Sequence, residues 1–274
     1  MKHSMKRSFI PLLLLLTLLA GCETVQTTSS GAVGVDRKQH MMVSAEQMNQ
    51  ASAQSYVQTM QEAQQKGLLN RDQNQLNRVR TIAQRLIPAA GVFRADSLQW
   101  RWEVNVITSK EVNAWCMAGG KMAVYTGLMD ALQLTDDELA AVMGHEIAHA
   151  LREHSREKAS QQQAQNLLLG IGAAVLGVGQ AGADLAGMAA QVTYGLPNSR
   201  EFEREADHIG VELAARAGYN PRAAVTLWQK MARVSGGGGP GFLSTHPSPT
   251  DRMQDLAKYA EAVMPLYQQS ASRR

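Results

Sequence analysis

The chain has 274 residues, of which 45% are hydrophobic and 19% are charged. This length and composition suit one globular domain with a sizeable core, and they exclude an intrinsically disordered chain or a protein with many membrane spans. The formal charge of +3 includes Lys2, Lys6 and Arg7 near the N-terminus. Without those three residues, 24 basic residues stand against 24 acidic ones, so the charge predicts no nucleic-acid partner.

Residues 1–21 are predicted to be a lipoprotein signal peptide. They have a basic start, an apolar run from Phe9 to Ala20 that is too short to span a bilayer as a mature helix, and a small-residue ending. The letters LAGC at 19–22 resemble the bacterial lipobox, which implies lipidation of Cys22 and a membrane partner reached through that anchor. Glu23 follows instead of the aspartate that retains lipoproteins in the inner membrane of enteric bacteria, so we expect the outer membrane, facing the periplasm.

Residues 22–44 are rich in Ser, Thr and Gly and lack a clear period, so they are predicted to be a flexible tether. Residues 45–66 favour a helix, and hydrophobic spacing predicts a second helix over 72–87 that stops at Pro88. Alternation over 100–106 predicts a strand, and NAWCMAGGKMAVYTGLM at 113–129 predicts two more, joined at glycines. We expect these strands to form a small antiparallel sheet.

The rest of the chain is predicted to be helical. The run LLLGIGAAVLGVG at 167–179 is shorter than a membrane span, so a buried or membrane-facing helical hairpin is favoured over insertion across a membrane. Later helices are predicted to begin near Ser199, Pro221 and Pro249. These elements place one domain at 45–265 and a C-terminal tail at 266–274. Cys116 is the one cysteine left after lipidation, and it is expected to be a small buried hydrophobe rather than a reactive thiol.

The helix predicted from Thr135 carries the motif AVMGHEIAHALREHS at 141–155. Thr135 and Glu138 form a capping box at its start. His145 and His149 are four residues apart, so one face presents both imidazoles to the same point, and Glu146 can reach a water bound there. Zinc accepts two neutral imidazoles and a carboxylate and keeps a fourth position for water, which a glutamate then deprotonates.

Such a site needs a third ligand. A metzincin would have a histidine six residues after His149, but that position is Ser155. His154 would point about 140° away from His149 on a continuous helix, so it is predicted to be a solvated side chain rather than a ligand.

The segment SREFEREADHIG at 199–210 offers three glutamates as the third ligand: Glu201, Glu203 and Glu205. Glu203 is favoured because Asp207 lies one turn further on and can hold the N–H of a ligating imidazole. An ordinary charged helix face is the alternative for this segment taken alone. Together with the first motif, it predicts one zinc ion per chain.

HEIAH followed some fifty residues later by EREAD resembles the gluzincin metallopeptidases of the HtpX and BepA type. The similarity covers about residues 70–265. It implies an α+β fold, a mostly helical zincin-like metallopeptidase domain with a small antiparallel sheet beside the active-site helix. It also implies zinc ligands at His145, His149 and Glu203, with Glu146 as the general base, and protein or peptide substrates.

Further roles follow from the resemblance. THPSPTDR at 245–252 is similar to the family's C-terminal His-Pro element, which implies that His246 lies close to the metal, where it caps the ion at rest or stabilises the oxyanion. Its place after a glycine run fits a movable lid. Arg252 is a candidate for stabilising the tetrahedral intermediate, and Tyr194 is a weaker one. Asn113 and Ala114 begin the run that resembles the family's substrate-binding edge strand.

We therefore predict a zinc-dependent endopeptidase that acts on unfolded or misassembled envelope proteins. No motif in the sequence identifies a partner protein in envelope assembly. One alternative is a non-catalytic lipoprotein chaperone or scaffold for outer-membrane assembly that keeps the zinc for structure, although such a site has no use for Glu146. A helical lipoprotein without metal is a second alternative, and it requires both motifs to be coincidental.

Overall fold

The computed structural model describes residues 23–176, 185–234, 242–247 and 251–272, with the backbone alone for residues 167–176, 185–186 and 234. The predicted signal peptide, the predicted lipidation site at Cys22 and the glycine run at 235–241 lie outside the described residues. The predicted hairpin at 167–179 falls on a stretch whose side chains are not described. No helix in the part of the chain that the structure covers is long and apolar enough to cross a membrane.

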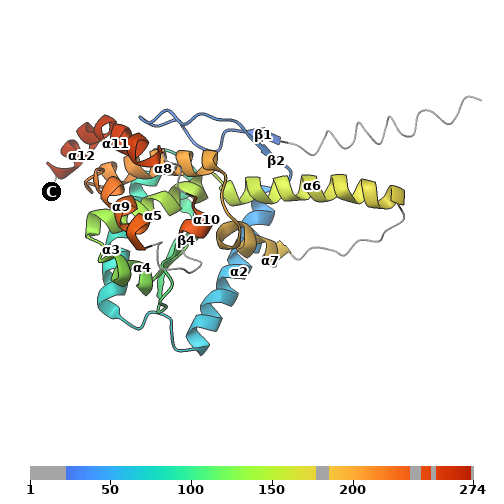
Figure 1. Ribbon diagram of the computed structural model, residues 1–274, viewed down its shortest axis with the longest axis horizontal. Coiled ribbons are helices and arrows are strands. Elements are labelled where there is room, and N and C mark those ends of the chain that lie inside the picture. The colour runs from blue at the N-terminus through green and yellow to red at the C-terminus, as the bar shows by residue number, and fades with distance from the viewer. Residues whose placement is uncertain (1–22, 177–184, 235–241, 248–250, 273–274) are drawn as a thin grey trace, which may run out of the picture.

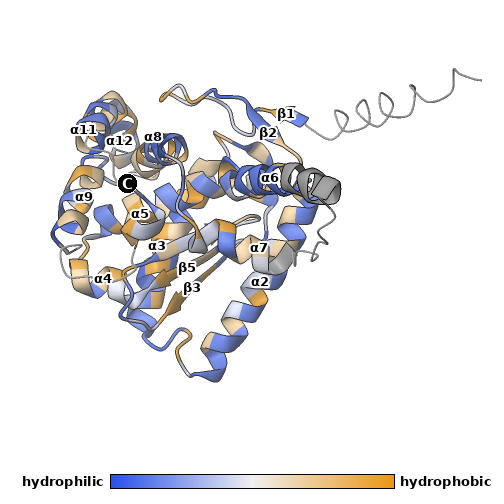
Figure 2. Ribbon diagram, turned by 45° about the vertical axis from the view of Figure 1, so that its right-hand side comes forward, coloured by the Kyte–Doolittle hydropathy of each residue, from blue (hydrophilic) through white to orange (hydrophobic). Residues whose placement is uncertain are grey.

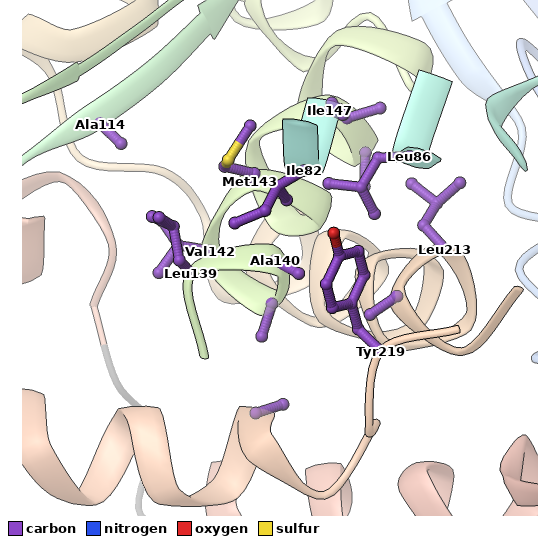
Figure 3. Packing of buried hydrophobic residues seen from close by; sticks show 14 of the residues in the cluster. Ile82, Leu86, Ala114, Leu139, Ala140, Val142, Met143, Ile147, Leu213 and Tyr219 are labelled. Atoms are coloured by element: carbon purple, nitrogen blue, oxygen red, sulfur yellow. The ribbon is translucent and has the colours of Figure 1, made fainter. Parts of the chain in front are cut away.

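Helix α5 (Asp136–Leu151) is the central element of the domain (Figure 1). Its predicted capping box is present, since Thr135 Oγ1 accepts from Glu138 N and Glu138 Oε2 accepts from Thr135 N. Every residue from Glu138 to Leu151 is buried. Apolar side chains of α5, α3 (Gln73–Ala90), α8 (Arg200–Arg216) and β4 (Ala114–Met117) meet in one core (Figure 3). This core holds the HEIAH face between the sheet and α8.

The three-stranded sheet has the order β3-β5-β4, with β3 at Glu103–Ile107 and β5 at Lys121–Tyr125. Strands β3 and β5 are mostly hydrophobic in Figure 2 and lie between helices. The predicted strands are present, but the sheet is mixed rather than antiparallel: β4 pairs antiparallel with β5, whereas β3 pairs parallel with β5. Gly119 and Gly120, with φ of 75° and 78°, turn β4 back along β5. Alternation reveals that a segment is a strand but not its direction, so the sequence could not supply the parallel pair.

Most remaining elements are helices. They are α2 (Ala45–Gln65), η1 (Ala95–Gln99), α4 (Thr126–Leu132), α6 (His154–Leu176), α7 (Leu185–Ala190), the π-helical turn η2 (Gln191–Gly195), α9 (Ala223–Val234), α10 (Phe242–Thr245), α11 (Arg252–Ala262) and α12 (Met264–Ala271). Pro88 lies inside α3 instead of ending it. Cys116 is buried on β4, as predicted, and burial raises the pKa of its thiol.

The predicted C-terminal tail is wrong, because residues 264–271 form α12. Leu266 and Tyr267 pack against the main core, and Ser270 Oγ donates to Arg216 O at the end of α8. The segment is short and has a weak hydrophobic pattern, so its packing depends on partners that are remote in sequence.

The prediction of a flexible tether also differs from the structure. Residues 23–44, hereafter the N-terminal segment, include strands β1 (Glu23–Val25) and β2 (Gln39–Met41), which pair antiparallel. The segment runs over α8 and the start of α6 (Figure 1). Glu212, fully buried on α8, accepts from Ala32 N and Val33 N. Buried hydrogen bonds between the backbone and a remote side chain thus hold the segment, and hydrophobic periodicity does not detect them.

Two glycines allow α5 and α8 to cross closely. A Cβ on Gly144 would lie 2.9 Å from Gly210 O, and a Cβ on Gly210 would lie 2.8 Å from His145 N. Neither backbone can yield without moving a helix. The approach matters because α5 carries the histidines and α8 carries Glu203.

We expect Gly210→Ala to lower the free energy of unfolding by about 1–3 kcal/mol, because overpacking pushes α5 and α8 apart. Urea unfolding measures this change, and zinc titration should show weaker binding. Gly195→Ala is the control, since the nearest atom to its Cβ would be Gln191 Cγ at 3.5 Å, an ordinary contact. Wild-type stability and zinc affinity in Gly210→Ala would show that the close crossing does not matter.

Candidate metal centre

Three donor side chains from two helices converge at the crossing of α5 and α8. The two Nε2 atoms of His145 and His149 lie 3.1 Å apart. Glu203, in the first turn of α8, places Oε1 3.3 Å from His149 Nε2 and Oε2 3.5 Å from His145 Nε2. All three side chains are buried. The structure therefore brings the two predicted motifs to a single point.

His246 joins them as a fourth member, following α10. One ligand atom from each of His145, His149, Glu203 and His246 lies within 4.8 Å of the other three. The Nδ1 atom of His246 lies 3.0 Å from Thr245 Oγ1 and 3.1 Å from Phe242 O, and its ring stacks on Phe242. These contacts direct the opposite edge of the ring, with Nε2, towards the other donors.

The donor group fits a metal ion. Bonds of about 2.0–2.1 Å in a tetrahedral site place neighbouring ligand atoms about 3.3 Å apart, and the three helix-borne donors lie 3.1–3.5 Å apart. Burial raises the pKa of Glu203, but His246 and His145 outweigh burial and hold that pKa well below its usual range. Burial lowers the pKa of His149 to about 4, which favours the neutral imidazole that metals bind.

Glu146 lies on α5 beside this group and is 3% exposed. Its Oε1 lies 3.4 Å from His246 Nε2 and makes no hydrogen bond among the described residues. Burial raises the pKa of this carboxyl to about 8. A carboxyl whose pKa lies near neutrality can both take up and release a proton in that pH range, which general acid–base catalysis requires.

Asp207 and Arg252 support the donors from behind. Asp207 Oδ1 lies 2.9 Å from His145 Nδ1, the geometry predicted from the spacing in α8. Burial raises the pKa of Asp207, but Arg252 and His145 together outweigh burial and lower that pKa, so the carboxyl stays ionised. Arg252 Nη2 donates to Asp207 Oδ1 at 2.7 Å, and its Nη1 lies 3.0 Å from Glu203 Oε2. The guanidinium thus contacts both carboxylates, and its predicted role at the oxyanion stays a prediction.

The prediction that His154 is solvated is wrong. Its side chain is 1% exposed, its Nδ1 lies 2.8 Å from His149 Nδ1, and its Nε2 lies 2.9 Å from Glu205 Oε2. Glu153 has a left-handed φ of 52° and separates α5 from α6, so the helix is not continuous. The change of direction turns His154 back towards His149.

Asn198 and Lys158 are contacts that the sequence analysis missed. Asn198 Nδ2 donates to Glu203 Oε1 at 2.8 Å, and Lys158 Nζ donates to Asn198 Oδ1 at 2.6 Å. Asn198 precedes α8 and Lys158 lies on α6, and no spacing rule relates them to Glu203. The amide fixes one oxygen of Glu203 while Arg252 faces the other.

The predicted substrate strand lies at an edge of the three-stranded sheet. Ala114 begins β4, and Asn113 before it accepts from Ala114 N through its side chain and from Tyr125 N through its main chain. Trp115 of β4 stacks on Tyr194 with ring centroids 5.4 Å apart. Tyr194 therefore lines this edge, and nothing in its contacts supports the predicted role at the oxyanion.

Comparison with known proteins gives one family match and several relatives. The model of Peptidase family M48 matches residues 73–260. The chain is 40% identical over 157 residues to mitochondrial metalloendopeptidase OMA1 of Arabidopsis thaliana, covering 57% of this chain and 31% of that protein. It is 34% identical over 187 residues to OMA1 of Schizosaccharomyces pombe, covering 66% of this chain and 52% of that protein. It is also 32% identical over 192 residues to the beta-barrel assembly-enhancing protease of Escherichia coli K12, covering 66% of this chain and 39% of that protein. The matches thus span about a third to a half of these relatives.

Proposed function

Because this chain belongs to Peptidase family M48, we propose that it is a zinc-dependent endopeptidase that hydrolyses peptide bonds in unfolded or misassembled proteins. One observation carries the proposal: His145, His149 and Glu203 present three donors at the spacing of a metal's ligands, with Glu146 as a buried base beside them. Two imidazoles and a carboxylate are a donor set of catalytic zinc sites, which leave one position for water.

These three side chains would hold a zinc ion, which would supply Lewis acidity towards the water and the scissile carbonyl. Glu146 accepts a proton from the attacking water and passes it to the nitrogen of the leaving amine. His246 Nε2 faces the same space. In the tautomer whose proton is on Nε2, with Nδ1 accepting from Thr245 Oγ1, His246 donates a hydrogen bond to the carbonyl oxygen as that oxygen gains charge. Asp207 and Arg252 hold His145 and Glu203 in place throughout.

The position of β4 supports an extended polypeptide as substrate. An edge strand pairs with a peptide through main-chain hydrogen bonds, which requires an unfolded segment but little particular sequence. Asn113 and Ala114 lie where this pairing would begin. The name of one relative refers to enhancing the assembly of β-barrels, and we propose misassembled envelope proteins as the substrates of this chain.

The proposed location rests on the N-terminal sequence. The lipobox at 19–22 supports a lipid anchor on Cys22 and a place in the outer membrane facing the periplasm. In combining a lipobox with the HEIAH and EREAD motifs, the chain resembles the lipoprotein metalloprotease LoiP. The relatives include both mitochondrial and bacterial proteins, so they do not decide between compartments.

The alternative function, a non-catalytic scaffold that keeps zinc for structure, is less well supported. A structural zinc site is closed by four protein ligands and needs no base. Glu146 is nevertheless buried beside the donors, and its Oε1 makes no hydrogen bond to any part of the chain that the structure describes. This costs stability unless the side chain acts on something bound there.

Removal of zinc tests the proposal. We expect the purified chain to contain one zinc ion, to cleave unfolded casein, to lose cleavage with 1,10-phenanthroline, and to regain it when zinc is restored. Metal analysis and gel electrophoresis measure these properties. Bound zinc without cleavage would favour the scaffold, and a chain that binds no zinc would overturn both readings.

A further inference from the structure

Beyond the donors and Glu146, a series of buried polar contacts continues behind His149. The Nε2 atom of His149 faces the donor group, and its Nδ1 lies 2.8 Å from Nδ1 of His154. The Nε2 atom of His154 lies 2.9 Å from Glu205 Oε2. His154 also stacks on Phe202, with ring centroids 4.5 Å apart and an angle of 6° between the planes. Polar contacts at both nitrogens and the stacking on Phe202 therefore hold the ring of His154 in one orientation.

The donors and acceptors in this series determine which nitrogen of each imidazole carries a proton. A carboxylate only accepts, so the proton between His154 and Glu205 lies on His154 Nε2. One proton also lies between the two Nδ1 atoms. If it belongs to His149, His154 is a neutral acceptor, and His149 keeps a lone pair on Nε2 for a metal. The reverse arrangement would place a proton on His149 Nε2 and prevent ligation.

Two arginines hold the far end of the series. Arg152, fully buried, donates from Nε and Nη2 to Glu205, at 3.0 Å in each case. Arg37 of the N-terminal segment donates from Nε to Glu205 Oε1 at 2.8 Å and from its two Nη atoms to Glu157 at 2.7 and 2.8 Å. The segment thus contributes a guanidinium that is linked to His149, a candidate metal ligand, through Glu205 and His154.

We propose that His154 and Glu205 are positioning residues that fix the tautomer and ring orientation of His149, and that Arg37 couples docking of the N-terminal segment to the affinity of the metal site. This inference rests on the proposed function for the identity of the metal. His154 would thus support the imidazole of His149 as Asp207 supports that of His145.

Zinc affinity of the full chain, measured by competition with a chromophoric chelator, tests the proposal. His154→Leu removes the acceptor, and the expected loss is about 10–100-fold, the usual effect of losing such a partner. His154→Asn keeps an acceptor near the Nδ1 position and should restore most of that loss. Co²⁺-loaded His154→Leu should also show altered visible bands, because the imidazole is no longer held in one orientation.

Two controls separate this role from general stability. His208→Phe removes a different buried histidine, which lies on α8, contacts Asp255 and stacks on Tyr259, away from the donors. It should leave zinc affinity unchanged. Arg37→Met should weaken zinc binding several-fold, whereas Arg78→Met, which breaks a contact to Asp136, should not. Because Arg37 is a partly exposed residue, its variant remains informative even if His154→Leu does not fold.

Wild-type zinc affinity in folded His154→Leu, or no difference between Leu and Asn at this position, would overturn the role of His154. Wild-type affinity in Arg37→Met would overturn the coupling to the N-terminal segment. A wild-type chain that binds zinc but does not cleave would overturn the proposed function alone, since affinity and spectra are read without turnover.

Discussion

Replacing Glu146 by glutamine should reduce peptide-bond cleavage at least about 1,000-fold while leaving zinc bound, within the range that general acid–base catalysis contributes. The amide keeps the size of the side chain but cannot accept the proton of the attacking water. Glu146 is not among the donors of the metal group, so its loss should not remove the ion. Cleavage of a quenched peptide and zinc content measured on the same preparation report the two effects separately.

Glu138→Gln is the matched control for this variant. Glu138 is also buried on α5, but it binds Lys230 and Thr226 away from the donors. We expect this change to lower thermal stability and to leave cleavage per folded molecule within about threefold, because no group near the reacting atoms is altered. Cleavage by Glu146→Gln within tenfold of wild type would contradict its role as the base.

Arg252→Met should lower the free energy of unfolding of the metal-free protein by about 3–5 kcal/mol, the usual cost of breaking a buried ion pair. Arg252 is 3% exposed and contacts the carboxylates of Glu203 and Asp207. Without it, two buried negative charges face each other across the imidazole of His145. Methionine preserves part of the packing against Trp228, on which the guanidinium lies. Urea unfolding in the presence of a chelator measures the change.

The same variant distinguishes the two roles of Arg252. If it positions Glu203, zinc affinity should fall together with stability; if it stabilises the oxyanion, kcat should fall at unchanged affinity. Arg222→Met is the control, because Arg222 pairs with Glu261 on an exposed surface, where such pairs contribute little. Unchanged unfolding of metal-free Arg252→Met would show that the carboxylates need no counter-charge.

The side-chain placements in the site that the sequence predicted and the structure has are those that depend on one helix at a time. The spacing of His145 and His149 on α5 and of Glu203 and Asp207 on α8 follows from the helical repeat, and the structure has both pairs facing the same point. The helices of the core were predictable for the same reason. Each of these features is encoded within a few residues of the chain.

The features that the sequence did not predict depend on contacts between remote segments or on a break in a helix. The angle assigned to His154 assumed that α5 continues, whereas Glu153 adopts a left-handed φ and redirects the chain. Asn198 and Arg37 of the N-terminal segment meet their partners through hydrogen bonds between distant positions. Single-sequence patterns report burial of apolar residues, so they do not detect this kind of packing.

The packing of the N-terminal segment has a practical consequence for fragment design. The family match begins at residue 73, and a truncation placed there would remove Arg37 and Gln39. Gln39 donates to Arg152 O and to Glu157. A fragment cut at that boundary would leave the carboxylates of Glu157 and Glu212 without donors that reach them from this segment. We therefore expect soluble, metal-competent fragments to start no later than residue 23.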